Sequence, residues 1–351
     1  MTDIFTQDRP DDEDQQEARA GRRRLGRPAK VVLAVVAGLV AVALVIAVGL
    51  SVFAANLARE FDSGTTKLDQ AFPEDTSRPA IDESGALNVL LLGSDSRGDA
   101  TTLEDASASD QRTDTMMLVH VSADRRRVDV MSIMRDLWVP IPGRGEAKIN
   151  ASFAYGGSPL AVQTVEDLLG VRIDHVAIID FEGFAGMTEA LGGVDVLSEK
   201  AFAVDGESYA AGMNHLEGER ALLFVRARYA FVDGDYQRVR NQQAFLRAVV
   251  DRVISRDTLT DPGALTDFVG SVSRYLTVDA GLDSATLASL GLSLRDLDQA
   301  DVNFFTIPTA GTGTSADGQS IVNLSPYEMP ALRGALQADT MAAYAAANPT
   351  R

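Results

Sequence analysis

The sequence predicts an α/β protein with one three-layer α/β/α domain around a central mixed β-sheet, preceded by one transmembrane helix. Three observations predict it. An uncharged apolar run at residues 31–55 has the length of a membrane span. Three β-rich segments then follow one another closely, which indicates a central sheet. After Lys148, segments with helical spacing alternate with buried strands, as in layered domains with helices on both faces of a sheet.

The composition limits the class of protein. With 351 residues, of which 46% are hydrophobic, the chain is long enough for one large domain and additional segments. It has no cysteine, which excludes both a disulfide framework and a thiolate metal site. A formal net charge of -18 argues against a general affinity for nucleic acid or for anionic lipid surfaces. Any anionic ligand must therefore be bound by a local basic cluster.

Residues 31–55 form the predicted transmembrane helix. The run VVLAVVAGLVAVALVIAVGLSVFAA has neither charge nor proline, and as a helix it spans a hydrocarbon core of about 30 Å. Basic residues precede it: Arg19, Arg22, Arg23, Arg24, Arg27 and Lys30. The positive-inside rule then predicts a cytoplasmic N-terminus and an extracellular domain on the cell membrane. A buried core helix is rarely this long, and a cleaved signal peptide usually has an apolar region of only about 7–15 residues.

The rest of the chain divides by composition. Residues 1–30, rich in Asp, Glu, Gln and Arg, are predicted to be a disordered cytoplasmic tail. Residues 56–85 are polar, with scattered glycine and proline, and are predicted to be an extracytoplasmic stalk. The folded domain is predicted to cover residues 86–345.

Within this domain, apolar runs and helical spacing predict the elements in order. The expected strands are ALNVLLLG from Ala86, DTMMLVHVS from Asp114, RRVDVMSIM from Arg126, IDHVAIIDF from Ile173, GGVDVL near Val194 and the late VNFFTIP from Val302. The expected helices are 159–169, 181–191, 217–228 and 236–256, followed by DPGALTDFVGSV and SATLASLGLSLRDL.

Three short motifs place charged side chains at strand ends. In GSDSRG, Asp95 and Arg97 follow a strand, where α/β folds place their sites, although such residues are also common in ordinary loops. In QRTDTM, Arg112 and Asp114 are two residues apart, so in an extended segment they share a face. From the spacing alone, a surface ion pair or a turn cap is the more common explanation. Arg135 follows an apolar strand in SIMRDLW, together with an aspartate, either at the surface or in a site.

A fourth motif is an arginine cluster in ALLFVRARYAFVDGDYQRVRNQQAFL. It contains Arg226, Arg228, Arg238 and Arg240, with Gln242 and Gln243. A bend at 233–234 could bring Arg226 and Arg238 together. Arginine recognises phosphate through planar, bidentate and permanently charged contacts. A solvated helix face remains an alternative, because lysine is nearly absent from the predicted ectodomain and arginine is its usual cation.

The motifs GSDSRG, QRTDTMMLVHV, MSIMRD, KINASFAYGG, IDHVAIIDFEGF, ALGGVDV, HLEGERALLFVRAR and GDYQRVRNQQ, in this order, resemble the LytR-CpsA-Psr family. The match covers about residues 87–253. The resemblance implies a cell-wall phosphotransferase. Its partners would be a polyprenyl-pyrophosphate-linked glycan, a peptidoglycan acceptor and the cell membrane, with no nucleic acid. The product would be a phosphodiester between the glycopolymer and peptidoglycan.

The resemblance also assigns residues to roles. Asp95 and Asp114 would hold Mg²⁺ (or Mn²⁺), and the catalytic set would be Asp95, Arg112, Asp114, Arg135, Arg226 and Arg238. Pyrophosphate would be bound by Arg97, Arg112, Arg135, Arg226, Arg228, Arg238 and Gln242. Two positions depart from the family pattern: Met134 stands where proline is usual, and Asn241 where a basic residue is common.

These residue types suit phosphoryl transfer, which needs in-line positioning and neutralisation of charge more than covalent help. Mg²⁺ prefers oxygen ligands, and with only three histidines a zinc site is improbable. No residue is identified as the base. Apolar stripes on three expected helices could line a slot for a polyprenyl tail or could be ordinary core. A non-catalytic binding module and a pyrophosphatase acting on the same lipid-linked substrate remain alternative functions.

Overall fold

The computed structural model describes residues 53–81, 83–94, 113–254 and 262–348, and apart from Phe53 these belong to a compact unit that begins at Ala54. The predicted cytoplasmic tail and residues 31–52 of the predicted transmembrane helix lie outside the described residues. Within the described part of the chain, no helix has the length and apolarity needed to cross a membrane.

A seven-stranded mixed sheet forms the centre, in the order β1-β12-β7-β2-β3-β4-β13. Its strands are β1 (Thr66–Leu68), β2 (Leu87–Ser94), β3 (Thr113–Val121), β4 (Val128–Ser132), β7 (His175–Asp180), β12 (Leu276–Asp279) and β13 (Val302–Thr306). β2 runs antiparallel to β3 and parallel to β7, and β4 runs antiparallel to β3 and parallel to β13. This mixed pairing confirms the predicted α/β sheet.

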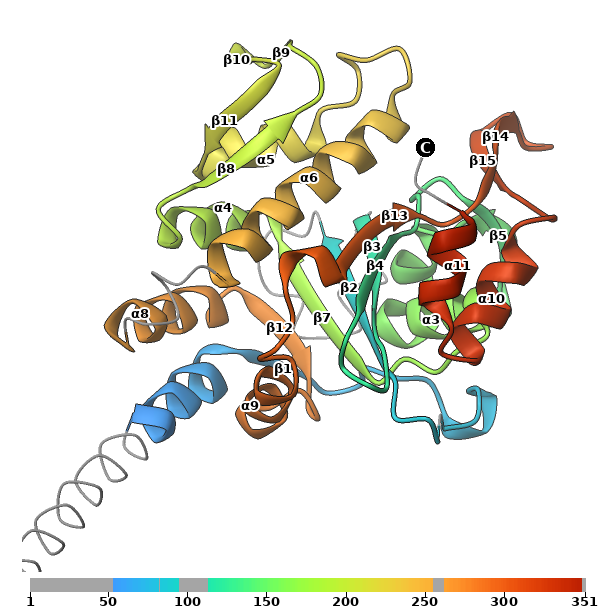
Figure 1. The fold of residues 1–351 in the computed structure, drawn as a ribbon. Coiled ribbons are helices and arrows are strands. Elements are labelled where there is room, and N and C mark those ends of the chain that lie inside the picture. Colours follow the sequence, from blue (N-terminus) through green and yellow to red (C-terminus); the bar gives the residue numbers. More distant parts are fainter. Residues whose placement is uncertain (1–52, 82, 95–112, 255–261, 349–351) are drawn as a thin grey trace, which may run out of the picture. The chain divides into compact units, whose positions relative to one another are not determined.

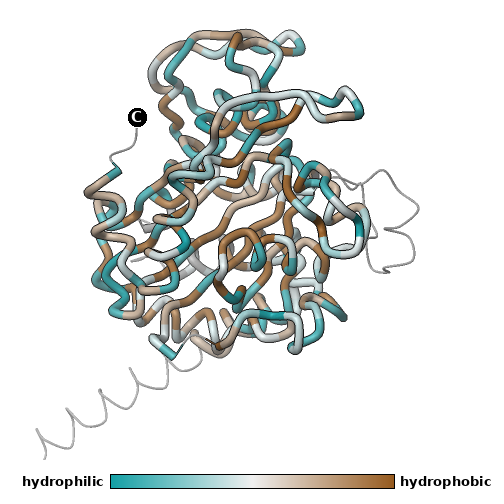
Figure 2. Tube along the Cα trace, turned by 90° about the vertical axis from the view of Figure 1, so that its right-hand side faces the viewer, coloured by the Kyte–Doolittle hydropathy of each residue, from teal (hydrophilic) through white to brown (hydrophobic). Residues whose placement is uncertain are grey.

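Successive side chains of a strand point to opposite faces of the sheet. The buried strands carry apolar side chains on both faces, and helices cover each face. Leu90 and Met116 pack on one face with α3 (Ala151–Leu169), α10 (Met329–Gln337) and α11 (Met341–Ala347). Met117 and Phe304 pack on the other face, against α6 (Asp235–Ile254). Figure 1 shows α3, α10 and α11 on one side of the sheet and α4, α5 and α6 on the other. In Figure 2 the central strands are largely hydrophobic and many connecting loops hydrophilic.

A smaller core lies beside α6. It is built by α4 (Phe181–Ala190), α5 (Gly218–Arg226), β8 (Val194–Ser198), β9 (Phe202–Val204), β10 (Glu207–Tyr209) and β11 (Gly212–Leu216). Aromatic rings fill it: Phe202 stacks on Tyr209 with 4.6 Å between centroids, and both lie close to Phe224. Further elements are the β5–β6 hairpin (Trp138–Ile141 and Gly145–Lys148), α8 (Pro262–Ser273), α9 (Ser284–Ser293), the β14–β15 hairpin (Thr309–Thr314 and Ser320–Leu324), and two short 3-10 helices, η1 (Asp75–Ser77) and η2 (Gln299–Asp301).

The segment predicted to be a stalk is packed into the folded unit instead. β1 adds a parallel edge strand next to β12, and Phe61 is buried. Farther along, the Arg78 guanidinium lies 2.8 Å from the carboxylate of Glu166 on α3, with both side chains almost fully buried. The sequence hides this packing, because three residues of strand give no periodicity and a buried arginine looks like any polar residue.

The helix expected at 159–169 begins eight residues earlier, at Ala151. It is interrupted at Gly156 and Gly157, and Gly157 has a φ of 62°, in the left-handed region that favours glycine. Pro159 then lies in the first turn of the second half, where a missing N–H is tolerated. The expected helix is therefore the second part of a kinked one.

Candidate functional site

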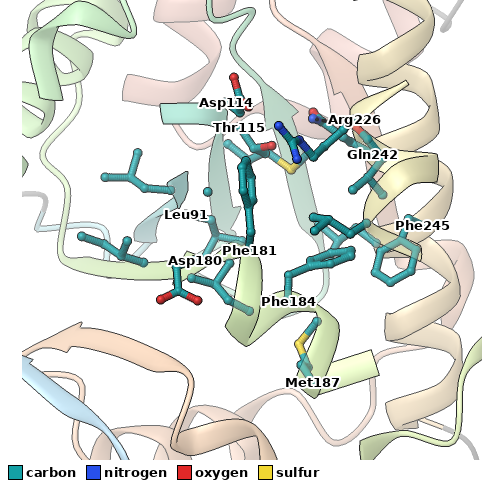
Figure 3. Close-up of a pocket in the computed structure, with 18 of the residues that line it drawn as sticks. Leu91, Asp114, Thr115, Asp180, Phe181, Phe184, Met187, Arg226, Gln242 and Phe245 are labelled. Carbon is teal, nitrogen blue, oxygen red and sulfur yellow. Dashed lines mark hydrogen bonds between the residues drawn. The ribbon is translucent and has the colours of Figure 1, made fainter. Parts of the chain in front are cut away.

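A cavity of about 230 Å³ lies between the sheet and the helices α4, α5 and α6. Most of its lining is apolar: Leu91, Met117, Ile178, Phe181, Phe184, Met187, Leu222, Val225, Phe245, Leu246 and Val249. Polar residues also line it: Asp114, Thr115, Arg226, Arg238 and Gln242, together with Asp180, whose carboxylate accepts from the Gly183 N–H at the start of α4. In Figure 3 the labelled Asp114, Arg226 and Gln242 lie toward one end, and Phe184 and Met187 toward the other. The cavity therefore suits a ligand with an apolar tail and an anionic head.

Helical spacing builds the apolar walls. On α4, Phe181, Phe184 and Met187 follow one another at intervals of three residues, so they share one face. Phe245 on α6 meets Phe184 with 4.8 Å between ring centroids. These two stripes are among those predicted to line an apolar slot. The third, at 160–169 on α3, belongs to the core on the opposite face of the sheet.

The polar end is set by the connection between α5 and α6. Arg226 is the last residue of α5, and its guanidinium lies 4.1 Å from the centroid of the Phe181 ring. Gly234, with a φ of 46°, helps the chain turn into α6. Arg238 follows on the first turns of α6, and Gln242 stands one turn later with its amide donating to the Val225 carbonyl at 3.3 Å. Arg226 and Arg238, which we expected a bend to bring together, both line the cavity.

Three arginines converge on one carboxylate next to the cavity-lining Arg238. Asp235 lies 3.3 Å from Arg238 Nη2, 3.8 Å from Arg228 Nη1 and 4.0 Å from Arg135 Nε. Arg135, in the turn after β4, also donates from Nη1 to Asp114 Oδ1. The cluster thus joins the start of β3, the β4–β5 turn and both sides of the α5–α6 loop.

Two guanidinium donors in this cluster have no acceptor among the described residues. They are Nε of Arg135 and Nε of Arg238, both buried. Burial lowers the pKa of Arg238, which is 4% exposed, and the positive charges of Arg135 and Arg228 act in the same direction. A buried donor without a partner costs about 1–3 kcal/mol or more when charged. An anion bound between these two arginines would meet both donors and offset their mutual repulsion.

A pair of carboxyl groups completes the cluster. The carboxyl groups of Asp136 and Asp235 interact, and each shifts the pKa of the other. Burial and hydrogen bonding to the Asp136 carboxyl group raise the pKa of Asp235. Burial also acts to raise the pKa of Asp136. The contact with Asp235 and the positive charges of Arg135 and Lys148 outweigh burial, so the pKa of Asp136 is lowered. Lys148 Nζ lies 3.0 Å from Asp136. Asp235 was missed in the sequence, although it precedes Arg238 by three residues and so shares its helix face.

The structure brings together the sequence-predicted residues that it describes: Asp114, Arg135, Arg226, Arg228, Arg238 and Gln242. Arg240 instead pairs with Glu199 at 3.0 Å and with Asp233. Gln243 donates to Ser132 at 2.9 Å and so ties α6 to the sheet.

Three predicted residues, Asp95, Arg97 and Arg112, lie outside the described residues, so their roles stay predictions. The two departures from the family pattern have structural settings. Met134 is buried in the core, and buried Asn241 donates to the Phe224 carbonyl at 3.3 Å. Neither side chain replaces a charged group in the cluster.

For a divalent cation, the described part of the chain offers Asp114, which lies beside the cavity and next to the arginines. No group of three or more histidine and acidic side chains that could hold a metal ion occurs among the residues that the structure describes. A single carboxylate oxygen donor fits Mg²⁺, which is commonly held by one or two carboxylates together with substrate phosphates.

The fold and the site define an α/β protein with an apolar cavity that leads to a buried arginine cluster. The chain belongs to the LytR-CpsA-Psr family, because the model described as the LytR_cpsA_psr family matches residues 52–338. A Bacillus cereus (strain AH820) protein named polyisoprenyl-teichoic acid–peptidoglycan teichoic acid transferase TagU is 31% identical over 245 residues, 68% of this chain and 78% of that protein. The cell wall biosynthesis protein LcpA of Corynebacterium glutamicum is 29% identical over 286 residues, 70% of this chain. This chain spans only 55% of LcpA.

Solved structures share the fold. The B. subtilis TagV structure has a TM-score of 0.63 at 22% identity and covers 74% of this chain and 98% of that one. TagT bound to LI-WTA has a TM-score of 0.59 at 25% identity and covers 79% of this chain and 99% of that one. The mixed sheet with flanking helices is therefore the architecture of the family.

Proposed function

We propose that this protein is a phosphotransferase that moves a glycopolymer from a polyprenyl-pyrophosphate carrier to peptidoglycan and joins them by a phosphodiester. The observation that carries the proposal is the continuity between an apolar cavity and a buried arginine cluster. A lipid-linked pyrophosphate has the same two parts in the same order. Family membership and the transferase names of its relatives support the assignment.

The apolar part of the cavity would hold the start of the prenyl chain. Each buried methylene contributes about 0.8 kcal/mol, so walls of aromatic and aliphatic side chains favour a lipid-linked ligand over free pyrophosphate. The rings of Phe181, Phe184 and Phe245 offer flat surfaces to a branched, unsaturated chain. Arg226 and Arg238 then lie where the lipid-proximal phosphate would be.

The arginine cluster would bind the phosphates and stabilise the leaving lipid phosphate. The unpaired Nε donors of Arg135 and Arg238 are available to non-bridging oxygens, and arginine contacts to phosphate are charge-assisted. Asp114, together with Asp95, would hold Mg²⁺ or Mn²⁺. When bound, this cation would neutralise negative charge on the pyrophosphate.

The substrate also accounts for the topology read from the sequence. A polyprenyl carrier stays in the membrane, so a transmembrane helix at 31–55 would hold the extracellular domain beside its substrate. The N-terminus would then be cytoplasmic and peptidoglycan on the same side as the domain. Teichoic acid is named for the Bacillus relative, and teichoic acid or arabinogalactan is the class of polymer that we expect here.

Reconstitution of the full chain with polyprenyl-pyrophosphate-linked glycan and peptidoglycan fragments tests the proposal. Wild type should form glycan-linked peptidoglycan and release polyprenyl phosphate in equal amounts. Arg238→Ala should lower kcat/KM about 10- to 100-fold or more, because charged hydrogen bonds contribute about 1.5–3 kcal/mol each. Arg240→Ala is the matched control, since its pairs lie at the surface, and should stay within about twofold of wild type.

Two results would contradict the transferase. Release of lipid phosphate without glycan-linked peptidoglycan would indicate a pyrophosphatase. Tight binding of the lipid-linked glycan without turnover would indicate a binding module.

A further inference from the structure

The described residues that line the cavity include Asp114, Arg226 and Arg238 but not Asp136 or Asp235. Asp136 contacts Arg135, and Asp235 contacts both Arg135 and the cavity-lining Arg238, so the two acids lie next to the arginines that would hold the phosphates. In-line phosphoryl transfer places the attacking oxygen opposite the leaving oxygen. With the lipid in the cavity, the leaving phosphate would be at its polar end, and an acceptor hydroxyl that approached along the arginine cluster would meet Asp235.

We propose that Asp235 is the general base that takes the proton from the attacking acceptor hydroxyl, and that Asp136 assists through a carboxyl–carboxyl hydrogen bond. This inference rests on the proposed transferase function. Asp235 would be a catalytic residue, because its carboxylate would contact the reacting hydroxyl. Asp136 would not contact the substrate; it would be a positioning residue that sets the orientation and pKa of Asp235.

The surroundings distinguish the two acids. Asp136 is held as an anion by Lys148 Nζ at 3.0 Å and by Arg135 Nε at 3.7 Å. Asp235 has one close cation, Arg238 at 3.3 Å, and its distances to Arg135 and Arg228 are too long for hydrogen bonds. When phosphates bind to these arginines, the arginines stabilise the Asp235 carboxylate less. Asp136 stays paired with Lys148 and therefore stays ionised. Its carboxylate can then accept a hydrogen bond from Asp235 when Asp235 is protonated.

The pKa directions agree with this division of roles. Burial and the bond to Asp136 raise the pKa of Asp235, whereas the cations lower that of Asp136. A general base works best when its pKa is near the working pH. Asp114 is a poorer choice, because Arg135 binds its carboxylate and it is the expected metal ligand.

The transfer forms one P–O bond and breaks another. The acceptor oxygen forms a bond to the phosphorus that carries the glycan, and its proton moves to Asp235. The bond from that phosphorus to the bridging oxygen breaks, and its electron pair leaves with the lipid phosphate. The proton on Asp235 is then released to solvent, which restores the carboxylate.

The test measures the pH dependence of kcat for the full chain with lipid-linked glycan and peptidoglycan fragments. Wild type should show an acidic limb, in which activity rises with pH as Asp235 loses its proton. Asp235→Asn should lower kcat about 100-fold or more and remove this limb, because a base typically contributes about 10²–10⁴-fold. Its Kd for the lipid-linked glycan should stay within about threefold of wild type, a change of less than about 0.7 kcal/mol. Asp235→Glu should keep the limb.

Asp136→Asn provides an independent measurement. It removes the negative charge that helps to raise the pKa of Asp235 and leaves only a neutral amide oxygen as acceptor, so the acidic limb should move to lower pH. A structural role alone would lower activity without moving the limb. If Asp235→Asn does not fold, the shift in Asp136→Asn still decides the question. Asp233→Asn is the matched control, because this nearby acid pairs with Arg240, outside the cluster, and should change neither kcat nor the limb.

Three outcomes overturn the inference: an acidic limb that persists in Asp235→Asn, a loss of binding in that variant that accounts for its loss of kcat, or an unmoved limb in Asp136→Asn. Absence of glycan transfer by wild type would instead contradict the proposed function. The two failures are therefore separable.

Discussion

Arg135 and Asp114 form an ion pair between the β4–β5 turn and the start of β3, with Nη1 donating to Oδ1. The pair lies where the apolar cavity meets the arginine cluster. Before a ligand binds, Asp114 is therefore one of the counter-ions that stabilise Arg135. Its carboxylate, Asp136 and Asp235 together outweigh the effect of burial and raise the pKa of Arg135.

Asp114→Asn should separate phosphate binding from metal dependence. Removing the carboxylate leaves Arg135 with one counter-ion fewer, so binding of inorganic pyrophosphate without metal should be retained or strengthened. The increase in pyrophosphate affinity that Mg²⁺ gives wild type should fall about tenfold or more in the variant, because a carboxylate ligand is lost. Calorimetric titration of pyrophosphate with Mg²⁺ and with EDTA measures both effects. An unchanged Mg²⁺ effect would exclude Asp114 as a metal ligand.

Ala177→Leu should block the cavity without disturbing the arginines. Ala177 is on β7 and lines the cavity, so a larger side chain there enters empty space. The free energy of unfolding should change by less than about 1.5 kcal/mol, since overpacking costs arise where no space exists. Affinity for farnesyl pyrophosphate should fall about tenfold, a loss of about 1.4 kcal/mol. Affinity for inorganic pyrophosphate is the internal control and should stay the same. Equal losses for both ligands would mean that the cavity does not hold the prenyl chain.

The predictable part of the fold is the part with long, uniform patterns. β2, β3, β4 and β7 are apolar runs, and α4 and α6 have helical spacing, so each was expected close to its observed position. The β5–β6 and β14–β15 hairpins were not expected, because short strands at the edge of a domain bury few side chains and carry no clear period. The order of the strands in the sheet could not be predicted from the sequence either, because it depends on contacts between segments far apart in the chain, such as β1 and β12.

The candidate site was predictable where charge interrupts an apolar context. Arg135 and Arg226 follow apolar elements, and the structure places both in the site. Asp235 gives no such signal, because an acid in the first turn of a helix is expected from the helix dipole alone. Its proposed role rests on the three arginines that surround it, Arg228 and Arg238 from the α5–α6 segment and Arg135 from the turn after β4.

Arg78→Ala should destabilise the whole domain, because it removes one partner of a buried ion pair. Arg78 lies in the segment that the sequence predicted to be a stalk. The Arg78 and Glu166 side chains are 6% and 0% exposed, and Arg78 also donates to the Ile173 carbonyl. Losing one partner leaves a buried carboxylate uncompensated, which typically costs about 3–5 kcal/mol. For a domain of this size, Tm should fall by about 2–4 °C for each kcal/mol. Arg295→Ala is the control, because its pair with Asp296 is exposed and should contribute little. Thermal unfolding of the full chain measures both variants, and an unchanged Tm for Arg78→Ala would mean that the buried Arg78–Glu166 pair contributes no net stability.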